Sequence, residues 1–256
     1  MKKISDCVPG EDIVIQNQRF KLVIGTNAVV KSLLYLPLNE ECLAVGEEMP
    51  LFSVTQERPY NNEIKLAHPN KKTVFQANRL RRDGDILIVG FELVPYDARI
   101  RVKETPWYVS FQLFDFQVHK GYESPLNMDY PPVAELRLVQ LPIKNRENFG
   151  EWLNVSWDDN AAVCVLATSP YEVIDSQRHK DYREMSADAV NSLKLQGAEA
   201  ALIVCAADQL LDGIACLEEN YELPRGAEAR RSEMINASYY WASGATPQNI
   251  DEYIQY

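Results

Sequence analysis

Short apolar stretches recur along the chain from about residue 13 to residue 204, and turn-forming residues interrupt them every 8–12 residues or so. Alternation is sharpest in residues 86–93, where Leu87, Val89, Phe91 and Leu93 form one wholly apolar face. A period of two places successive side chains on opposite faces of a sheet, so the pattern predicts β-strands. The expected strands are Phe20–Ile24, Val29–Leu36, Phe52–Thr55, Glu63–Ala67, Thr73–Leu80, Asp85–Leu93, Ala98–Val102, Trp107–Phe116, Val133–Leu141, Ala161–Ala167 and Ala200–Cys205.

An Asp-Gly pair, Asp83-Gly84, separates two of these stretches. Such a pair between alternating runs is a strong hairpin signal, so residues 73–80 and 85–93 are expected to pair antiparallel. No long helical pattern interrupts the strand series, which disfavours parallel β-α-β winding. The sequence therefore predicts a mostly β fold, a large antiparallel β-sandwich. Arg79 and Arg81 fall on one face beside the hairpin and are expected to guard a solvated sheet edge.

Beyond the last expected strand, the period of two gives way to helical spacing. A helix is expected over about residues 207–219, with one buried side. Its apolar face consists of Leu210, Leu211, Ile214 and Leu217. This helix ends the first expected domain, residues 1–228.

Residues 229–256 carry a further strand and helix signal. Residues 237–241 form a compact aromatic strand candidate, and Thr246 and Pro247 are a typical N-cap and first helical residue. One strand and one helix cannot bury both their faces alone. Because the helical pattern runs to Tyr256 without a cap, we expect that the helix is cut and that the chain is the front part of a longer protein. The alternative is a C-terminal helix docked on the sandwich.

Composition and charge narrow the classes of function. The 256 residues are 46% hydrophobic and 25% charged, and the formal net charge of −11 repels phosphate backbones and anionic membranes. No nucleic-acid or membrane partner is therefore expected. The five cysteines are widely spaced without a C-x-x-C pair, and no phosphate-binding or zinc-hydrolase motif occurs, so neither a metal nor a cofactor is expected. The N-terminus lacks a signal-peptide core, which predicts a cytoplasmic protein if Met1 is native.

Several phrases of the sequence resemble one family of proteins. The opening phrases, Phe20–Leu33 and Asn39–Leu43, and the middle phrases, Ile64–Pro69, Thr73–Phe75 and Gly84–Phe91, resemble the large β-sandwich domain at the N-terminus of many glycoside hydrolases. The last phrases, Glu222–Pro224, Ser238–Trp241 and Asn249–Ile254, resemble the linker, first strand and first helix of the (β/α)8 barrel in α-galactosidase-like enzymes.

The resemblance implies a galactose-mutarotase-like supersandwich over residues 1–228, followed by a linker and the first strand and helix of a truncated (β/α)8 barrel over residues 229–256. In such enzymes the catalytic carboxylates lie on later barrel strands, beyond this chain. The implied role is a non-catalytic domain that packs on the barrel and shapes it, with a carbohydrate as the partner of the intact enzyme. Two alternatives stay open: a stand-alone carbohydrate-binding sandwich, and a structural or protein-interaction module.

Aromatic side chains are candidate sugar platforms, because the faces of pyranose rings pack on flat π surfaces. Tyr240 and Trp241 are the favoured substrate-lining residues, since they would lie at the C-terminal end of the first barrel strand. No catalytic residue is predicted in this chain. The acidic pairs Glu40-Glu41, Asp158-Asp159 and Glu218-Glu219 are expected to be solvated surface, because adjacent residues on a strand point to opposite faces. The other aromatic candidates are Trp107, Tyr108, Trp152, Trp157 and Tyr239.

Overall fold

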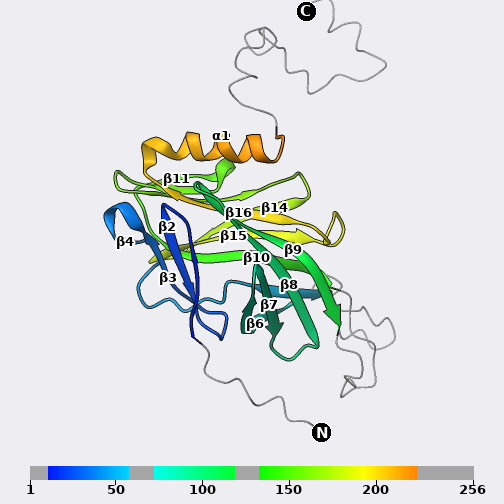
Figure 1. The fold of residues 1–256 in the computed structure, drawn as a ribbon. Helices are drawn as coiled ribbons and strands as arrows, with labels where there is room; N and C mark the ends of the chain where they lie inside the picture. Colours follow the sequence, from blue (N-terminus) through cyan, green and yellow to red (C-terminus); the bar gives the residue numbers. More distant parts are fainter. Residues whose placement is uncertain (1–10, 58–71, 119–132, 224–256) are drawn as a thin grey trace, which may run out of the picture.

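The computed structural model describes residues 11–57, 72–118 and 133–223, which fold mostly into β-strands (Figure 1). The first strands are β1 (Ile13–Gln16), β2 (Phe20–Ile24), β3 (Val30–Tyr35), β4 (Glu40–Glu41), β5 (Ser53–Glu57), β6 (Lys72–Asp83), β7 (Ile86–Phe91) and β8 (Tyr96–Glu104). They are followed by β9 (Tyr108–Val118), β10 (Val133–Lys144), β11 (Asn148–Gly150), β12 (Val155–Trp157), β13 (Ala162–Ala167), β14 (Glu172–Arg178), β15 (Tyr182–Val190) and β16 (Glu199–Cys205). The helical segments are the 3-10 turns η1 (Leu36–Leu38), η2 (Glu151–Leu153) and η3 (Ala207–Gln209) and the α-helix α1 (Leu210–Asn220).

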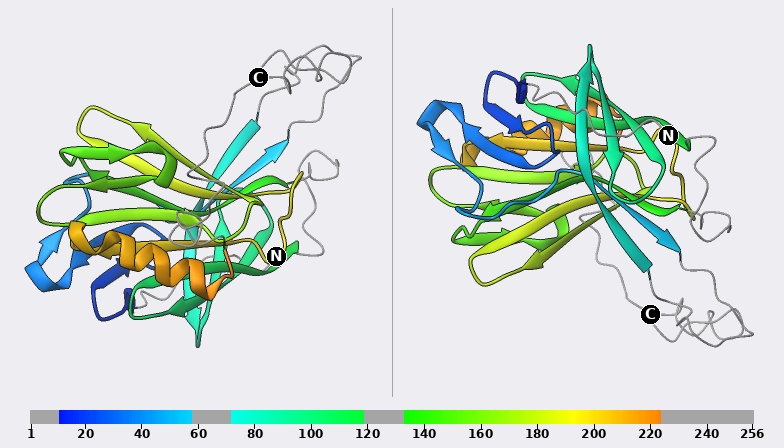
Figure 2. Two further views of the ribbon diagram at one scale, coloured as in Figure 1. Left: turned by 90° about the horizontal axis from the view of Figure 1, so that it is seen from above. Right: turned by 90° about the horizontal axis from the view of Figure 1, so that it is seen from below.

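Two large antiparallel sheets share one long strand, β6. Its residues 72–76 pair with β5, and its residues 77–83 pair with β7. One sheet has the strand order β6-β5-β10-β15-β14, and we call it the β10 sheet. The other, the β16 sheet, has the order β6-β7-β8-β9-β16-β13-β12-β11. In Figure 2, β6 is the long cyan strand that crosses the molecule between them. Strands β1 to β4 form a separate small sheet.

The β16 sheet buries both of its faces around β13 and β16, which is why these strands are apolar at successive positions. On β16, Leu202 and Val204 belong to the core between the large sheets, whereas Ala201 and Ile203 belong to a second cluster on the opposite face. Helix α1 covers this second cluster with Leu217. The layers are therefore α1, the β16 sheet and the β10 sheet, and Figure 1 shows α1 lying across the outside of the strands.

The predicted fold class is confirmed: the chain is mostly β, with large antiparallel sheets and one short helix near the end of the described residues. The predicted hairpin is also confirmed, since β6 and β7 pair from Asp83 opposite Ile86 around a tight turn. Gly84 takes a φ of +62° there, a conformation that favours glycine. The expected strand at 63–67 and the expected barrel strand and helix within 229–256 lie outside the described residues.

Other expectations need correction. The α-helix begins at Leu210 rather than near residue 207, because residues 207–209 form the 3-10 turn η3. Leu211 does not share the buried face, since it is 63% exposed. The second half of β6 does form an edge of the β16 sheet with Arg81 exposed, but Arg79 lies against Gly90 and 4.0 Å from Asp97. None of the described helices has the length and apolarity that a membrane crossing requires.

The sequence pattern also missed the hairpin of β14 and β15. Strand β14 reads Glu-Val-Ile-Asp-Ser-Gln-Arg, with polar residues at most positions, because it is the last strand of the β10 sheet and much of it faces solvent. Its apolar content is too low to give a strand signal from alternation alone. This hairpin carries two of the residues that line the candidate site.

Candidate functional site

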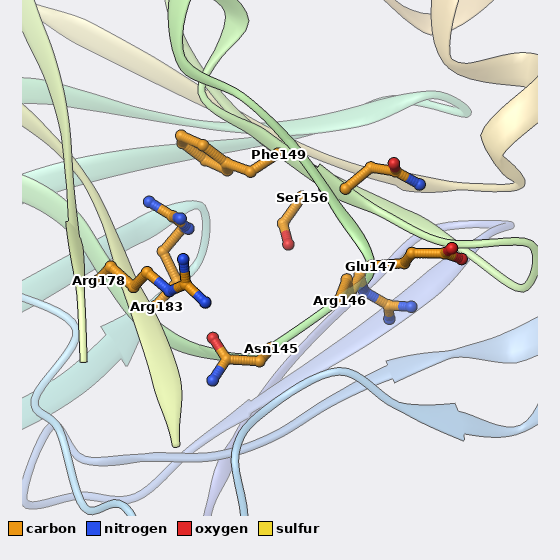
Figure 3. Close-up of a pocket in the computed structure, with 8 residues that line it drawn as sticks. Asn145, Arg146, Glu147, Phe149, Ser156, Arg178 and Arg183 are labelled. Carbon is orange, nitrogen blue, oxygen red and sulfur yellow. The ribbon is translucent and has the colours of Figure 1, made fainter. Parts of the chain in front are cut away.

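A polar pocket of about 280 Å³ opens at one end of the sandwich. Its walls come from the connection between β10 and β11, from β11 and β12 of the β16 sheet, and from the hairpin of β14 and β15 in the β10 sheet (Figure 3). The residues that line it are Asn145, Arg146, Glu147, Asn148, Phe149, Ser156, Arg178 and Arg183. We call it the arginine pocket.

The β14–β15 hairpin brings two arginines together. Arg178 is the last residue of β14, and it pairs directly with Arg183 of β15. In the turn between them, the backbone N–H of His179 donates to the carbonyl of Tyr182 at 2.8 Å, and the two rings stack with centroids 4.2 Å apart. Directly paired residues extend from the same face of a sheet. Both guanidinium groups therefore point into the pocket, as Figure 3 shows.

Neutral groups hold the Arg183 side chain in position. Its guanidinium carbon lies 3.5 Å from the centroid of the Phe149 ring, and its Nη1 donates to the Ser176 hydroxyl at 3.3 Å. Burial and the positive charge of Arg178 lower the pKa of Arg183, and the Glu151 carboxylate opposes this shift. The charge of Arg183 is thus oriented by its contacts but has no directly bound carboxylate among the described residues.

Arg178 has no hydrogen-bonded or ion-paired carboxylate within the part of the chain that the structure describes. The remaining side chains that face the pocket in Figure 3, Asn145 and Ser156, are uncharged. The Asn145 amide donates to the carbonyl of Lys180 at 3.0 Å, which ties the β10–β11 connection to the hairpin turn. Glu147 is the one carboxylate that lines the pocket, and it is directed away from the two arginines. The pocket therefore offers positive charge and hydrogen-bond donors.

Arg146 also lines the pocket, but its charge is already neutralised. Its Nη1 donates to both carboxylate oxygens of Asp158 at 2.8 Å, and its Nη2 donates to Glu40 at 2.9 Å. The side chain is 0% exposed, and its Nε has no hydrogen-bond partner among the described residues. Burial alone would raise the pKa of Asp158, but backbone N–H donors and the Arg146 charge lower it below its ordinary value. Arg146 therefore ties the β10–β11 connection to β4 and to the residue after β12 as a structural ion-pair centre.

Two further pockets lie elsewhere on the surface. One of about 420 Å³ is apolar and lies between η2 and the start of α1, beside Trp152, which is 94% exposed. Its lining residues are Gly150, Trp152, Leu153, Val155, Trp157, Ala207, Leu210 and Leu211. The other, of about 410 Å³, lies beside β3 and β4 and includes Glu41, whose carboxylate accepts hydrogen bonds from Ser32 and from the backbone of Leu33 and Leu43.

The favoured substrate-lining residues of the sequence analysis, Tyr240 and Trp241, lie outside the described residues. Of the acidic pairs, Glu40, Glu41 and Asp158 were wrongly expected to be solvated surface. They accept hydrogen bonds from arginine, serine and backbone groups, because a short strand or turn places each beside a donor from a distant segment. Of the other aromatic candidates, Trp152 is exposed beside the apolar pocket, whereas Tyr108 is fully buried.

The two arginines of the pocket were missed by sequence reasoning. One signal in the sequence was available: Arg178 and Arg183 are separated by four residues that include a polar Lys180-Asp181 pair, a spacing that a short hairpin turn can convert into a direct cross-strand pair. The contribution of Phe149 and Ser156 from the other sheet had no local signal, because the contact between the sheets is set by the tertiary fold.

Among residues 11–57, 72–118 and 133–223, no three His, Cys, Asp or Glu side chains gather closely enough to hold a metal ion. The described cysteines are free thiols. Burial raises the pKa of the Cys42 thiol to about 11, against the opposing charge of Arg146. A thiol in this environment stays protonated at neutral pH, so Cys42 acts as a packed residue rather than a nucleophile.

No protein-family model matches the chain, and no curated protein matches it in sequence. Among solved structures, a bacterial glucoamylase complexed with acarbose is 12% identical, with a TM-score of 0.46, over 87% of this chain and 37% of the glucoamylase chain. A GH31 family sulfoquinovosidase from E. rectale, in complex with the aza-sugar inhibitor IFGSQ, is 10% identical, with a TM-score of 0.36, over 81% of this chain and 34% of its own. The chain thus spans little more than a third of either structure, and likeness this weak defines neither the fold nor the function of the present protein.

Proposed function

We propose that this chain is a non-catalytic β-sandwich domain of a carbohydrate-active enzyme, most consistent with a glycoside hydrolase. The carbohydrate-active assignment rests on the sequence resemblance, and the observation that supports the non-catalytic role is the engagement of the buried carboxylates. Glu172 accepts from Ser169 and from the backbone of Glu199, and Asp188 accepts from Arg137. Glycoside hydrolysis needs two carboxyl groups free to act across a sugar. Here the buried carboxylates hold strands together instead.

The third buried carboxylate, Glu199, is also occupied by hydrogen bonds within the fold. It accepts a hydrogen bond from the hydroxyl of Tyr221 at 2.5 Å and another from the Gln112 amide at 3.2 Å. Burial raises the pKa of the Tyr221 hydroxyl, and its hydrogen bond to Glu199 adds to the shift. Because Tyr221 follows α1, this contact fastens the end of the helix to the β16 sheet. The role of Glu199 is therefore anchoring.

In the proposed enzyme, the domain packs on a catalytic barrel that begins within residues 229–256, with Tyr240 and Trp241 lining the substrate site. This part of the proposal rests on the sequence resemblance. The apolar pocket beside Trp152 supports a contact surface, since an exposed indole over an apolar hollow gains free energy when covered. A barrel surface packed there would bury it.

The test compares this 256-residue chain with the full-length gene product in hydrolysis of a panel of aryl-glycosides. The proposal predicts turnover by the full-length product alone, and turnover by the chain itself would refute the non-catalytic role. In the full-length protein, Trp152→Ala should weaken the contact between the sandwich and the barrel, so that the two domains unfold in separate melting transitions. Leu193→Ala, also at an exposed residue, should leave the melting profile unchanged.

A stand-alone carbohydrate-binding sandwich is the second candidate. The observation that favours it is the 94% exposed Trp152, because an indole face presented to solvent can stack on a pyranose ring. Calorimetric titration of the chain with galactosides, glucosides and their oligosaccharides separates the two candidates. Saturable binding that Trp152→Ala abolishes would favour this second role.

A further inference from the structure

Two buried or partly buried arginines in this acidic chain are ion-paired with carboxylates. The Arg137 guanidinium binds Glu184 at 2.6 Å and Asp188 at 2.9 Å, and Arg146 binds Asp158 and Glu40. Acidic residues outnumber basic ones, 37 to 26, so carboxylates are plentiful. The arginine pocket is built differently: Arg178 is exposed and Arg183 is partly buried, and their guanidinium groups face one space without a directly bound carboxylate among the described residues.

The pairing of Arg178 with Arg183 has an electrostatic cost. Like charges placed directly opposite each other on antiparallel strands destabilise the pair. The neighbouring groups do not cancel this repulsion. Four of them are neutral: Phe149, Ser156, Asn145 and Ser176. The Glu151 carboxylate attracts the Arg183 charge but forms no ion pair with it. An anion between the two guanidinium groups would turn the repulsion into two attractions.

The geometry also suits recognition of an oxyanion. A guanidinium presents several N–H donors in a planar fork that matches a carboxylate or phosphate group. The stack on Phe149 and the bond to Ser176 fix the direction of Arg183 before any ligand arrives. The Ser156 hydroxyl faces the same space in Figure 3, where it can donate to a further ligand oxygen. The site is therefore organised in advance.

We propose that the arginine pocket binds the carboxylate or phosphate group of a small molecule, with Arg178 and Arg183 as its two cationic contacts. The pocket volume of about 280 Å³ is at the lower end for ligand sites, which fits a ligand no larger than a single sugar ring or a short acid. The proposal is for binding alone, since Glu147, the one carboxylate of the lining, is directed away from the two arginines. This anion-binding proposal goes beyond the proposed domain role, and it does not depend on that role.

The test is calorimetric titration of the chain at low ionic strength with three probes: inorganic phosphate, glucuronate and glucose. Phosphate or glucuronate should bind saturably at one site, and uncharged glucose should not bind there. Arg178→Gln and Arg183→Gln should each weaken anion binding about tenfold or more, as expected for loss of a hydrogen bond to a charged group. Arg178 is exposed, so its substitution should leave the fold intact.

Arg81→Gln is the matched control, because Arg81 is also an exposed strand arginine and its removal changes the net charge equally. Arg81→Gln should change the affinity for phosphate or glucuronate by less than about twofold. Phosphate binding without glucuronate binding identifies a phosphate site, and the reverse identifies a carboxylate site. The proposal is overturned if neither anion binds, or if Arg178→Gln and Arg81→Gln weaken binding equally. Anion binding that persists when the aryl-glycosidase and sugar-binding tests fail would leave this inference standing without the proposed function.

Discussion

Arg146 and Arg178 line the same pocket and differ in almost every physical respect. Arg146 is buried, and two carboxylates from distant segments neutralise it. Arg178 is exposed, faces another arginine and has no described carboxylate bound to it. The first arrangement stabilises the fold whatever the solution contains, while the second reaches its best energy only when an anion is present. Residue type alone therefore does not separate a structural arginine from a binding one.

The largest effect is expected when the paired arginine is removed. Arg146→Met should lower the free energy of unfolding by about 3–5 kcal/mol, because it leaves Asp158 without its cation and Glu40 with Lys144 alone. Denaturation by urea measures the change. As the control, Lys31→Met breaks the exposed ion pair with Asp12 and should cost about 1 kcal/mol or less. Equal losses in the two variants would contradict the structural role of Arg146.

The carboxylate partner gives a smaller and pH-dependent effect. Asp158→Asn should destabilise the protein by about 1.5–3 kcal/mol at neutral pH, since it weakens charge-assisted hydrogen bonds. The folded-state pKa of Asp158 lies below its unfolded value, so its contribution is present above an unfolded pKa of about 3.9 and is lost as the pH falls through the folded pKa. The stability difference between wild type and variant should shrink below about pH 4. A difference that grows on acidification would contradict the assignment.

The smallest effect on stability is expected at the unpaired arginine. Arg178→Gln should leave the free energy of unfolding of the anion-free protein unchanged or raise it by up to about 1 kcal/mol, because it removes the repulsion from Arg183. Chemical denaturation in a chloride buffer at low ionic strength measures it, and added salt should reduce any gain by screening. A loss above about 1 kcal/mol would indicate a structural partner for Arg178.

The fold was largely predictable where the sequence pattern was local and periodic. The β6–β7 hairpin followed from alternation and from the Asp-Gly turn, and the region of α1 followed from its helical spacing. Strand β14 was not predictable, because a half-exposed edge strand with polar side chains lacks a strong alternation signal. The last strand of a sheet can remain polar where its side chains face solvent, as most of those on β14 do in whole or in part.

The candidate site was not predictable from the sequence for a related reason. Phe149 and Arg183 lie on different sheets, and only the packing of those sheets brings the ring and the guanidinium to 3.5 Å. Likewise, Glu40 and Arg146 are far apart in sequence, so the acidic pair Glu40-Glu41 looks like ordinary surface until the fold places a cation beside it. Contacts of this kind need the tertiary structure.

The most direct test of the difference between the two arginines is the free energy of unfolding of wild type and Arg178→Gln, each with phosphate and with chloride at matched ionic strength. With free phosphate about tenfold above the dissociation constant, wild type should gain about 1.4 kcal/mol over chloride, because the ligand binds the folded state alone. Arg178→Gln should gain far less. The account is contradicted if phosphate stabilises both proteins equally or stabilises neither.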